Sequence, residues 1–139
     1  MITRGKLAQR TGVNVETVRY YEQRGLIPEP PRTASGYRQY TGDYVERIRF
    51  IKRAQKLGFT LEEIKELLSL RVDQEMDRGK VKQRASAKIV DIEKKISDLE
   101  RMKNQLTRLV TSCSGRGPTG ECPILEAIES EESFHAVAN

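Results

Sequence analysis

The feature that most limits the fold of this chain is a long heptad repeat between residues 80 and 112. Seven of its nine core positions are apolar; the a positions are Lys82, Ile89, Ile96, Lys103 and Val110, and the d positions are Ala85, Ile92, Leu99 and Leu106. A helix of this length reaches roughly 50 Å, which a domain this small cannot cover. Its apolar seam needs a partner helix. A second copy of the chain is the simplest partner, and an intramolecular hairpin is the alternative.

Two short helices near the N-terminus form a helix-turn-helix pattern. The first is predicted to begin at Thr3 and end at Gly12, and the second to begin after Asn14 and end at Gly25. In this motif the first residues of the second helix enter the major groove of DNA. The residues expected to contact DNA there are Glu16, Thr17, Arg19 and Tyr20.

The segment "ASGYRQY" (34–40) is predicted to form a small hairpin, or wing, with Gly36 in its turn. Its neighbourhood supplies three more candidate DNA ligands, which are Arg32, Tyr37 and Arg38. Arginine and tyrosine side chains can donate to phosphate oxygens. Packing in a small core is the alternative for Tyr20 and Tyr37, and it is the role we predict for Tyr21.

Both cysteines lie on one loop, "SCSGRGPTGECPILEAIE" (112–129), with eight residues between Cys113 and Cys122. Three glycines allow the turns that two thiolates need to close around one ion, namely Gly115, Gly117 and Gly120. Pro123 is favoured at the first position of a helix, so Cys122 is a predicted N-cap, where the helix dipole favours thiolate. A thiolate pair selects Hg(II), Cu(I), Ag(I) or Au(I); Cd(II), Pb(II) and Zn(II) need more ligands. A disulfide or two inert cysteines are the alternatives.

Charge is distributed unevenly along the chain. Residues 1–57 hold twelve Lys/Arg against five Asp/Glu, whereas residues 58–139 hold thirteen against fifteen. A basic front half indicates nucleic acid as a partner, although a merely solvated basic surface is the alternative. With one His, at position 135, and no Gly-rich phosphate loop or Ser/His/Asp grouping, the sequence argues against an enzyme.

The sequence also bears on cellular location. No apolar run approaches the roughly 18 residues of a membrane span, and no export signal opens the chain. We therefore expect no membrane partner, a reducing cytoplasmic location, and free thiols.

In combination, "GVNVETVRYYEQRGLIPEPPRTASGYRQY" (12–40), "RIRFIKRAQKLGFTLEEIKELL" (47–68) and the long helix ending at a cysteine loop resemble the MerR family of bacterial transcription regulators. The cysteine loop resembles that of the thiophilic-metal sensors, the mercury-type branch. The resemblance implies a mainly α fold. Its parts are a winged helix-turn-helix domain, a linking helix pair, an antiparallel coiled-coil dimerisation helix, and a metal-binding loop with a short helix.

The resemblance also implies a mechanism. A homodimer binds a near-palindromic promoter, and metal binding at the cysteine loop leads it to bend and untwist the DNA for RNA polymerase. The expected function is therefore metal-responsive activation of transcription. A different function remains open, in which the same cysteines respond to oxidants or electrophiles.

This chain departs from the family pattern at Arg78. Divalent-metal sensors of the family have a third cysteine there, contributed by the other subunit. A guanidinium cannot ligate a metal, so the site implied by the mercury-type resemblance lacks one thiol. Two thiolates suit linear coordination, and a non-thiol third ligand or weakened sensing are the alternatives. Arg78 is also a candidate to offset the negative charge of a two-thiolate site.

These features predict five regions along the chain. They are a DNA-binding domain with linking helices (1–70), a connector (71–79), the dimerisation helix (80–112), the metal-binding loop and short helix (113–130), and a flexible tail (131–139).

Overall fold

The computed structural model describes residues 1–131 and is mainly helical, which confirms the predicted fold class. Its elements are α1 (Arg4–Thr11), α2 (Val15–Gln23), α3 (Gly42–Lys56), α4 (Leu61–Val72), α5 (Arg78–Thr111), the 3-10 helix η1 (Thr119–Glu121) and α6 (Pro123–Glu129). The predicted tail, including His135, lies outside the described residues except for Glu131.

The chain divides into two compact units. The first covers residues 1–88 and the second begins at Ile89, so the division falls inside α5. The narrower regions predicted from the sequence remain predictions. In the described chain, no helix combines the length and the apolar character that crossing a membrane requires.

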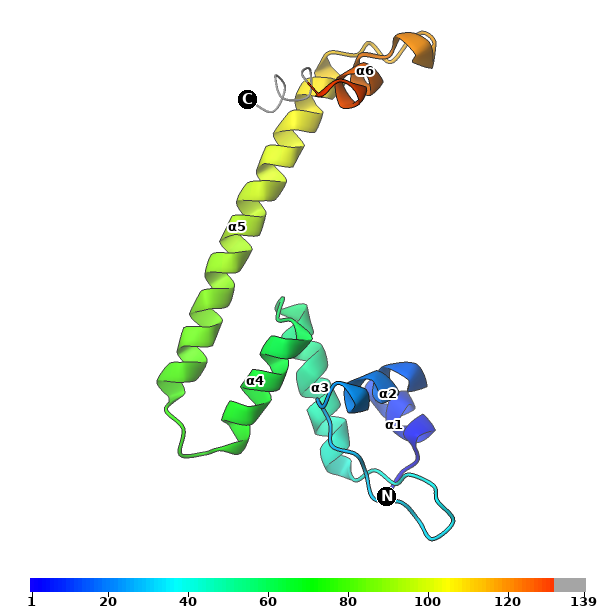
Figure 1. Ribbon diagram of the computed structural model, residues 1–139, viewed down its shortest axis with the longest axis vertical. Coiled ribbons are helices and arrows are strands. Elements are labelled where there is room, and N and C mark those ends of the chain that lie inside the picture. Colours follow the sequence, from blue (N-terminus) through cyan, green and yellow to red (C-terminus); the bar gives the residue numbers. More distant parts are fainter. Residues whose placement is uncertain (132–139) are drawn as a thin grey trace. The chain divides into compact units, whose positions relative to one another are not determined.

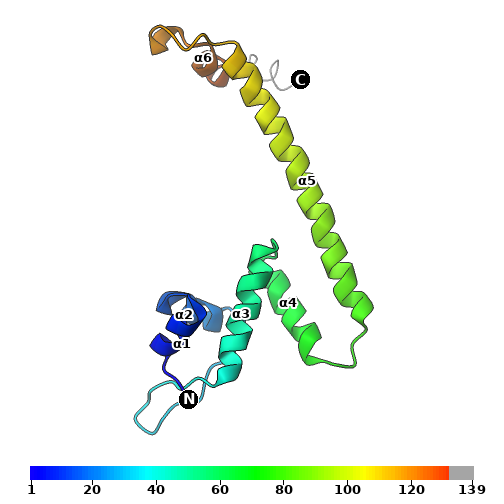
Figure 2. The same ribbon diagram turned by 180° about the vertical axis from the view of Figure 1, so that it is seen from behind.

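The core of the first unit lies where α1 packs on α2 and α3, and where α3 packs on α4. Both views of the molecule show α1 and α2 beside α3 (Figures 1 and 2). One face of α3 is apolar and buried; it consists of Val45, Ile48, Ile51 and Ala54. The fully buried side chains around it include Leu7, Val18, Leu26, Ile27 and Ile64. Burial of such side chains is the main source of stability for a unit this small.

The helix-turn-helix forms where the sequence predicted it, because local caps define its ends. The Thr3 hydroxyl accepts from the Lys6 amide at 3.2 Å, and Asn14 Oδ1 accepts from the Thr17 amide at 2.7 Å. Gly12 ends α1 with φ of 71°, a left-handed conformation in which glycine carries no steric cost.

The wing is a short hairpin, as predicted. An antiparallel bridge joins Arg32 to Arg38, and a second joins Ile2 to Tyr40 and ties the wing to the N-terminus. Within residues 1–131 these bridges are the only strand-like pairing. Gly36, with φ of 90°, turns the chain at the tip of the wing.

The linking helices follow the sequence closely. Thr60 and Glu63 form both hydrogen bonds of a capping box at the start of α4. The Glu63 carboxylate also accepts from Lys88 Nζ at 2.8 Å, and this lysine on α5 is only 5% exposed. Lys88 lowers the pKa of Glu63, because it stabilises the ionised carboxylate.

In the second unit α5 continues as one uninterrupted helix (Figure 1). Its seam residues from Ile89 to Val110 are between 37% and 63% exposed in the single chain; they are Ile89, Ile92, Ile96, Leu99, Leu106 and Val110. At its end α6 lies beside the last turns of α5 in both views (Figures 1 and 2), and Leu109 and Ala127 are buried.

Candidate nucleic-acid interface and metal site

The two tyrosines of α2 have different environments. Tyr20 is 42% exposed, and its hydroxyl accepts from Arg24 Nη1 at 2.8 Å. Tyr21 is 3% exposed and donates to Gln55 Oε1 at 3.1 Å, so it belongs to the core as predicted. The exposure of Tyr20 argues against the packing alternative, although the Arg24 guanidinium lies over its ring, 5.6 Å from the ring centroid.

The other candidates on α2 already have partners within the helix. Arg19 Nη1 lies 2.9 Å from Glu16 Oε1, in an exposed pair one turn apart. The Thr17 hydroxyl donates to Asn14 Oδ1 at 2.8 Å, so it is part of the N-terminal cap. Exposed pairs of this kind contribute little to stability, and Arg19 can exchange Glu16 for another anion at low cost.

The wing presents one free tyrosine ring and one paired arginine. Tyr37 is 73% exposed, which argues against its packing alternative. Arg32 lies 3.5 Å from the Glu29 carboxylate and donates to the Gly36 carbonyl at 3.4 Å.

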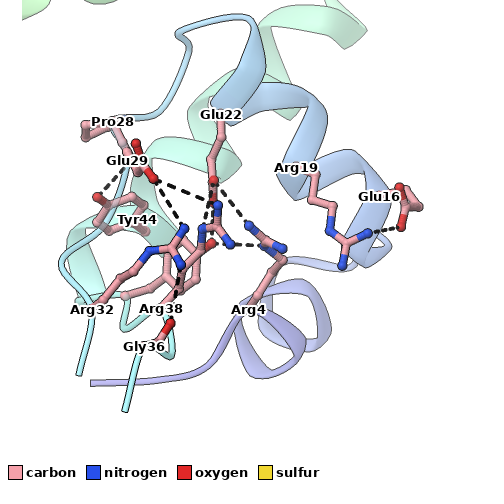
Figure 3. A network of polar contacts seen from close by, with 11 residues as sticks. Arg4, Glu16, Arg19, Glu22, Pro28, Glu29, Arg32, Gly36, Arg38 and Tyr44 are labelled. Atoms are coloured by element: carbon pink, nitrogen blue, oxygen red, sulfur yellow. Dashed lines mark hydrogen bonds and ion pairs between the residues drawn. The ribbon is translucent and has the colours of Figure 1, made fainter. Parts of the chain in front are cut away.

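Arg38 lies in a polar network built around one buried carboxylate (Figure 3). The Glu22 side chain is 8% exposed, and its Oε2 lies 3.3 Å from Arg4 Nη2 and 3.5 Å from Arg38 Nε. The Tyr40 hydroxyl donates to Glu22 Oε1 and accepts from Arg4 Nε at 3.1 Å. A buried carboxylate is costly unless it is paired, and here two guanidiniums and a phenol share that role.

Sequence reasoning missed Arg4, Glu22 and Tyr40. The contacts join positions 18 and 36 residues apart, and no periodic pattern links such positions. Burial, together with the neighbouring Glu22 carboxylate, raises the pKa of Tyr40 to about 12, since both disfavour the phenolate.

The structure brings the two cysteines to one cavity. Cys113 follows α5, Cys122 is the N-cap of α6 as predicted, and both thiols are free. Both border a cavity of about 410 Å³ formed by the loop itself. Gly115 and Gly117 have positive φ, of 77° and 105°, in agreement with their expected role.

Two details of the loop were not predicted. Gly120 lies inside η1, where the chain keeps a negative φ, so it does not supply a left-handed turn. The Gly115 amide donates to Cys113 Sγ at 3.4 Å. A sulfur that accepts a hydrogen bond is held in place.

Arg78 is the first residue of α5 and belongs to the first unit. It borders a cavity of about 430 Å³ together with Phe50, Leu67 and Met76. Among residues 1–131 no group of three or more His, Cys, Asp or Glu side chains is arranged to hold a metal ion.

A winged helix-turn-helix followed by linking helices and a long solvent-exposed helix is typical of a class of DNA-binding regulators. Two family models match this chain: the MerR HTH family regulatory protein over residues 2–70, and the MerR DNA-binding family over residues 45–109. The chain belongs to the MerR family of transcription regulators, as the sequence predicted, and it is not an enzyme.

Several similar proteins of the family are named for metal resistance or have solved structures that contain a metal ion. The chain is 47% identical over 129 residues to the mercuric resistance operon regulatory protein of Bacillus cereus, which covers 89% of this chain and 94% of the relative. Two solved structures share its fold. One is the regulator PbrR691 of Ralstonia metallidurans CH34 with lead(II), with a TM-score of 0.82 and 35% identity over 92% of this chain and 99% of that one. The other is MerR of Bacillus megaterium MB1 with mercury(II), with a TM-score of 0.70 and 40% identity over 93% of this chain and 100% of that one.

Proposed function

We propose that this chain is a metal-responsive transcription regulator that binds promoter DNA as a homodimer and senses a soft metal ion at Cys113 and Cys122. The observation that carries the proposal is the pair of free thiols bordering one cavity at the end of a long helix, in a chain whose other unit is a MerR-type DNA-binding domain. The metals named for the similar regulators support the same effector class.

The DNA interface consists of the first turns of α2 and the wing. Tyr20 and Tyr37 present exposed rings there, and the cations are Arg19, Arg32 and Arg38. Glu16 and Thr17 complete the proposed set at the start of α2. Arginine pairs with guanine or phosphate, whereas tyrosine hydroxyls donate to phosphate, so this set combines base readout with backbone positioning.

The homodimer forms through the α5 seam. Half-exposed isoleucine and leucine side chains along several heptads are unfavourable in water, and a second α5 running antiparallel buries them. A dimer also presents two copies of α2, which suits a near-palindromic promoter.

Two thiolates suit a soft ion. Mercury(II), Cu(I), Ag(I) and Au(I) match this donor set, whereas Cd(II), Pb(II) and Zn(II) match it less well without a third thiol. Arg78 occupies the position of that third thiol in the family pattern, and its charge suits an anionic two-thiolate site. The bound ion would supply a bridge between the end of α5 and the start of α6.

The output of the switch is a change in promoter DNA. If the metal-bound dimer favours a distorted DNA shape, the metal shifts the population toward that shape, and RNA polymerase then engages the promoter. Because its DNA target is cytoplasmic, we place the protein in the cytoplasm.

The direct test is anaerobic titration of the reduced dimer with Hg(II), Cu(I), Cd(II) and Zn(II), with X-ray absorption to count the sulfur ligands. We expect one soft ion per loop with two sulfur ligands, and loss of binding in Cys113→Ser and Cys122→Ser. Ser112→Ala, beside the loop thiol, is the matched control and should bind as the wild type does. Three sulfur ligands would contradict the two-thiolate site, and a reversible peroxide-induced mass change without metal binding would favour the redox function.

A further inference from the structure

Arg4 and Arg38 come from opposite ends of the DNA-binding domain but share one anion. Arg4 is the first residue of α1 and Arg38 follows the wing turn. Their guanidiniums lie 3.3 and 3.5 Å from the same carboxylate oxygen, Glu22 Oε2 (Figure 3). Two cations placed around one anion in a partly buried network are fixed relative to each other, whereas arginines on a surface usually move independently.

Both arginines also border an open cavity of about 280 Å³ between the start of α1 and the wing. The other residues that line it are Thr3, Gly5, Gly36 and Tyr37, and none of them is acidic. Cations and a phenol facing a hollow free of carboxylates favour the entry of an anion.

The contacts with Glu22 leave several N–H donors of each guanidinium without an acceptor in Glu22. Arginine carries five N–H donors, and Arg4 donates one to Tyr40 and one to Glu22. Arg38 Nε is buried and makes no hydrogen bond of normal geometry, although it lies within ion-pair distance of Glu22. An unsatisfied buried N–H is unfavourable, and a small movement of Arg38 toward an incoming acceptor would relieve it.

We propose that Arg4 and Arg38 together bind a single backbone phosphate of DNA, with Glu22 as the positioning residue that holds both guanidiniums at the cavity. The inference rests on the proposed DNA-binding function and adds Arg4 to the interface. Glu22 and Glu29 offset part of the charge of Arg4, Arg32 and Arg38, so the cluster keeps a net positive charge for the phosphate.

The test compares full-length Arg4→Gln, Arg38→Gln and wild-type dimers on a duplex selected with the wild type from random sequences. One phosphate contact contributes about 0.9 to the magnitude of the slope of log affinity against log salt. Each single variant leaves the other arginine at the shared phosphate, so we expect a smaller but measurable decrease in that magnitude per protomer. Binding should weaken alike on selected and random DNA, since a phosphate carries no base identity. Arg101→Gln removes the same charge at an outward heptad position of α5, and its slope should match the wild type.

Phosphate ethylation interference identifies the contact. We expect ethylation of one phosphate per half-site to inhibit the wild type, and the same phosphate to lose its influence in Arg4→Gln and in Arg38→Gln. Different phosphates for the two variants, or an Arg4→Gln slope equal to the wild type, would overturn the shared site. If the wild type bound no duplex, the proposed function itself would fail.

Two further variants separate positioning from folding. Glu22→Gln keeps the side-chain shape but breaks both ion pairs, so we expect a folded protein in which ethylation of the shared phosphate has less influence on binding. Wild-type ethylation interference at that phosphate in Glu22→Gln would contradict positioning. If Arg4→Gln does not fold, Arg4→Lys replaces it, because lysine keeps the positive charge but lacks the planar guanidinium. An unchanged salt slope with weaker ethylation interference at the shared phosphate would support the site. Wild-type behaviour in every measurement would overturn it.

Discussion

Glu22 shows how one buried residue can organise a surface. Its carboxylate, on α2, holds Arg4 from α1 and both Arg38 and the Tyr40 hydroxyl from the wing, so a single anion joins these three segments. A partly satisfied polar network weakens a fold, whereas a satisfied one selects one arrangement of side chains. We interpret the cluster as the part of the domain that sets the wing against α2.

At the residue scale we predict a pH effect from Tyr40. Its pKa is about 12 in the folded protein against 10.0 ordinarily, so the folded state retains a proton that the unfolded state releases. The stabilisation is complete below pH 10 and is lost as the pH rises toward 12. Tyr40→Phe should flatten this alkaline loss of stability and cost about 1–3 kcal/mol at neutral pH, because it leaves buried partners unsatisfied.

Chemical denaturation between pH 7 and 12 measures both effects. Tyr37→Phe is the matched control, since its ring is exposed and its hydroxyl has no such partners. The pKa values of Tyr21 and Tyr44 are also raised, so Tyr40→Phe should still lose some stability as the pH rises. A loss of stability at alkaline pH that is as steep in Tyr40→Phe as in the wild type would contradict the assignment.

At the element scale, the proposed dimer depends on the seam of α5. Leu99 lies at a d position near the middle of the seam and is 61% exposed in the single chain. Leu99→Lys would bury a charge in the proposed dimer, so we expect a monomer and weaker promoter binding. Analytical ultracentrifugation measures the mass, and Lys94→Gln, at an outward heptad position, should remain dimeric. A Leu99→Lys dimer of unchanged stability would exclude this seam as the interface.

The elements were predicted to different accuracy for physical reasons. Caps and breakers act locally, so α1 and α2 begin at the residues that Thr3 and Asn14 indicated. The wing followed from Gly36 and its neighbours. The start of α5 at Arg78, two residues before the predicted start at residue 80, was not predicted, because that region carries no heptad signal and Asp77 and Gly79 favour a turn.

At the scale of the whole molecule, the metal selectivity of the proposed site depends on the number of thiols that the proposed dimer provides. Arg78→Cys adds the thiol that the family pattern has at this position. We expect Cd(II) and Pb(II) to bind more tightly to this variant, because these ions prefer three thiolates to two. Competitive titration against a chelator measures the change, and Arg78→Ser, which removes the guanidinium without adding sulfur, is the control. Equal gains in both variants would show that loss of charge, rather than the new thiol, is responsible.

The sequence alone determined the family, the order of helices, the two-thiol loop and the seam of α5, because each rests on local spacing: caps, glycines, heptads and paired cysteines. The tertiary structure alone decided which polar side chains share a partner. Glu22 unites Arg4, Arg38 and Tyr40 only after α1, α2 and the wing have packed, and Tyr20 and Tyr37 differ from Tyr21 only in burial. Burial and long-range pairing arise from packing between distant segments, and no local pattern encodes them.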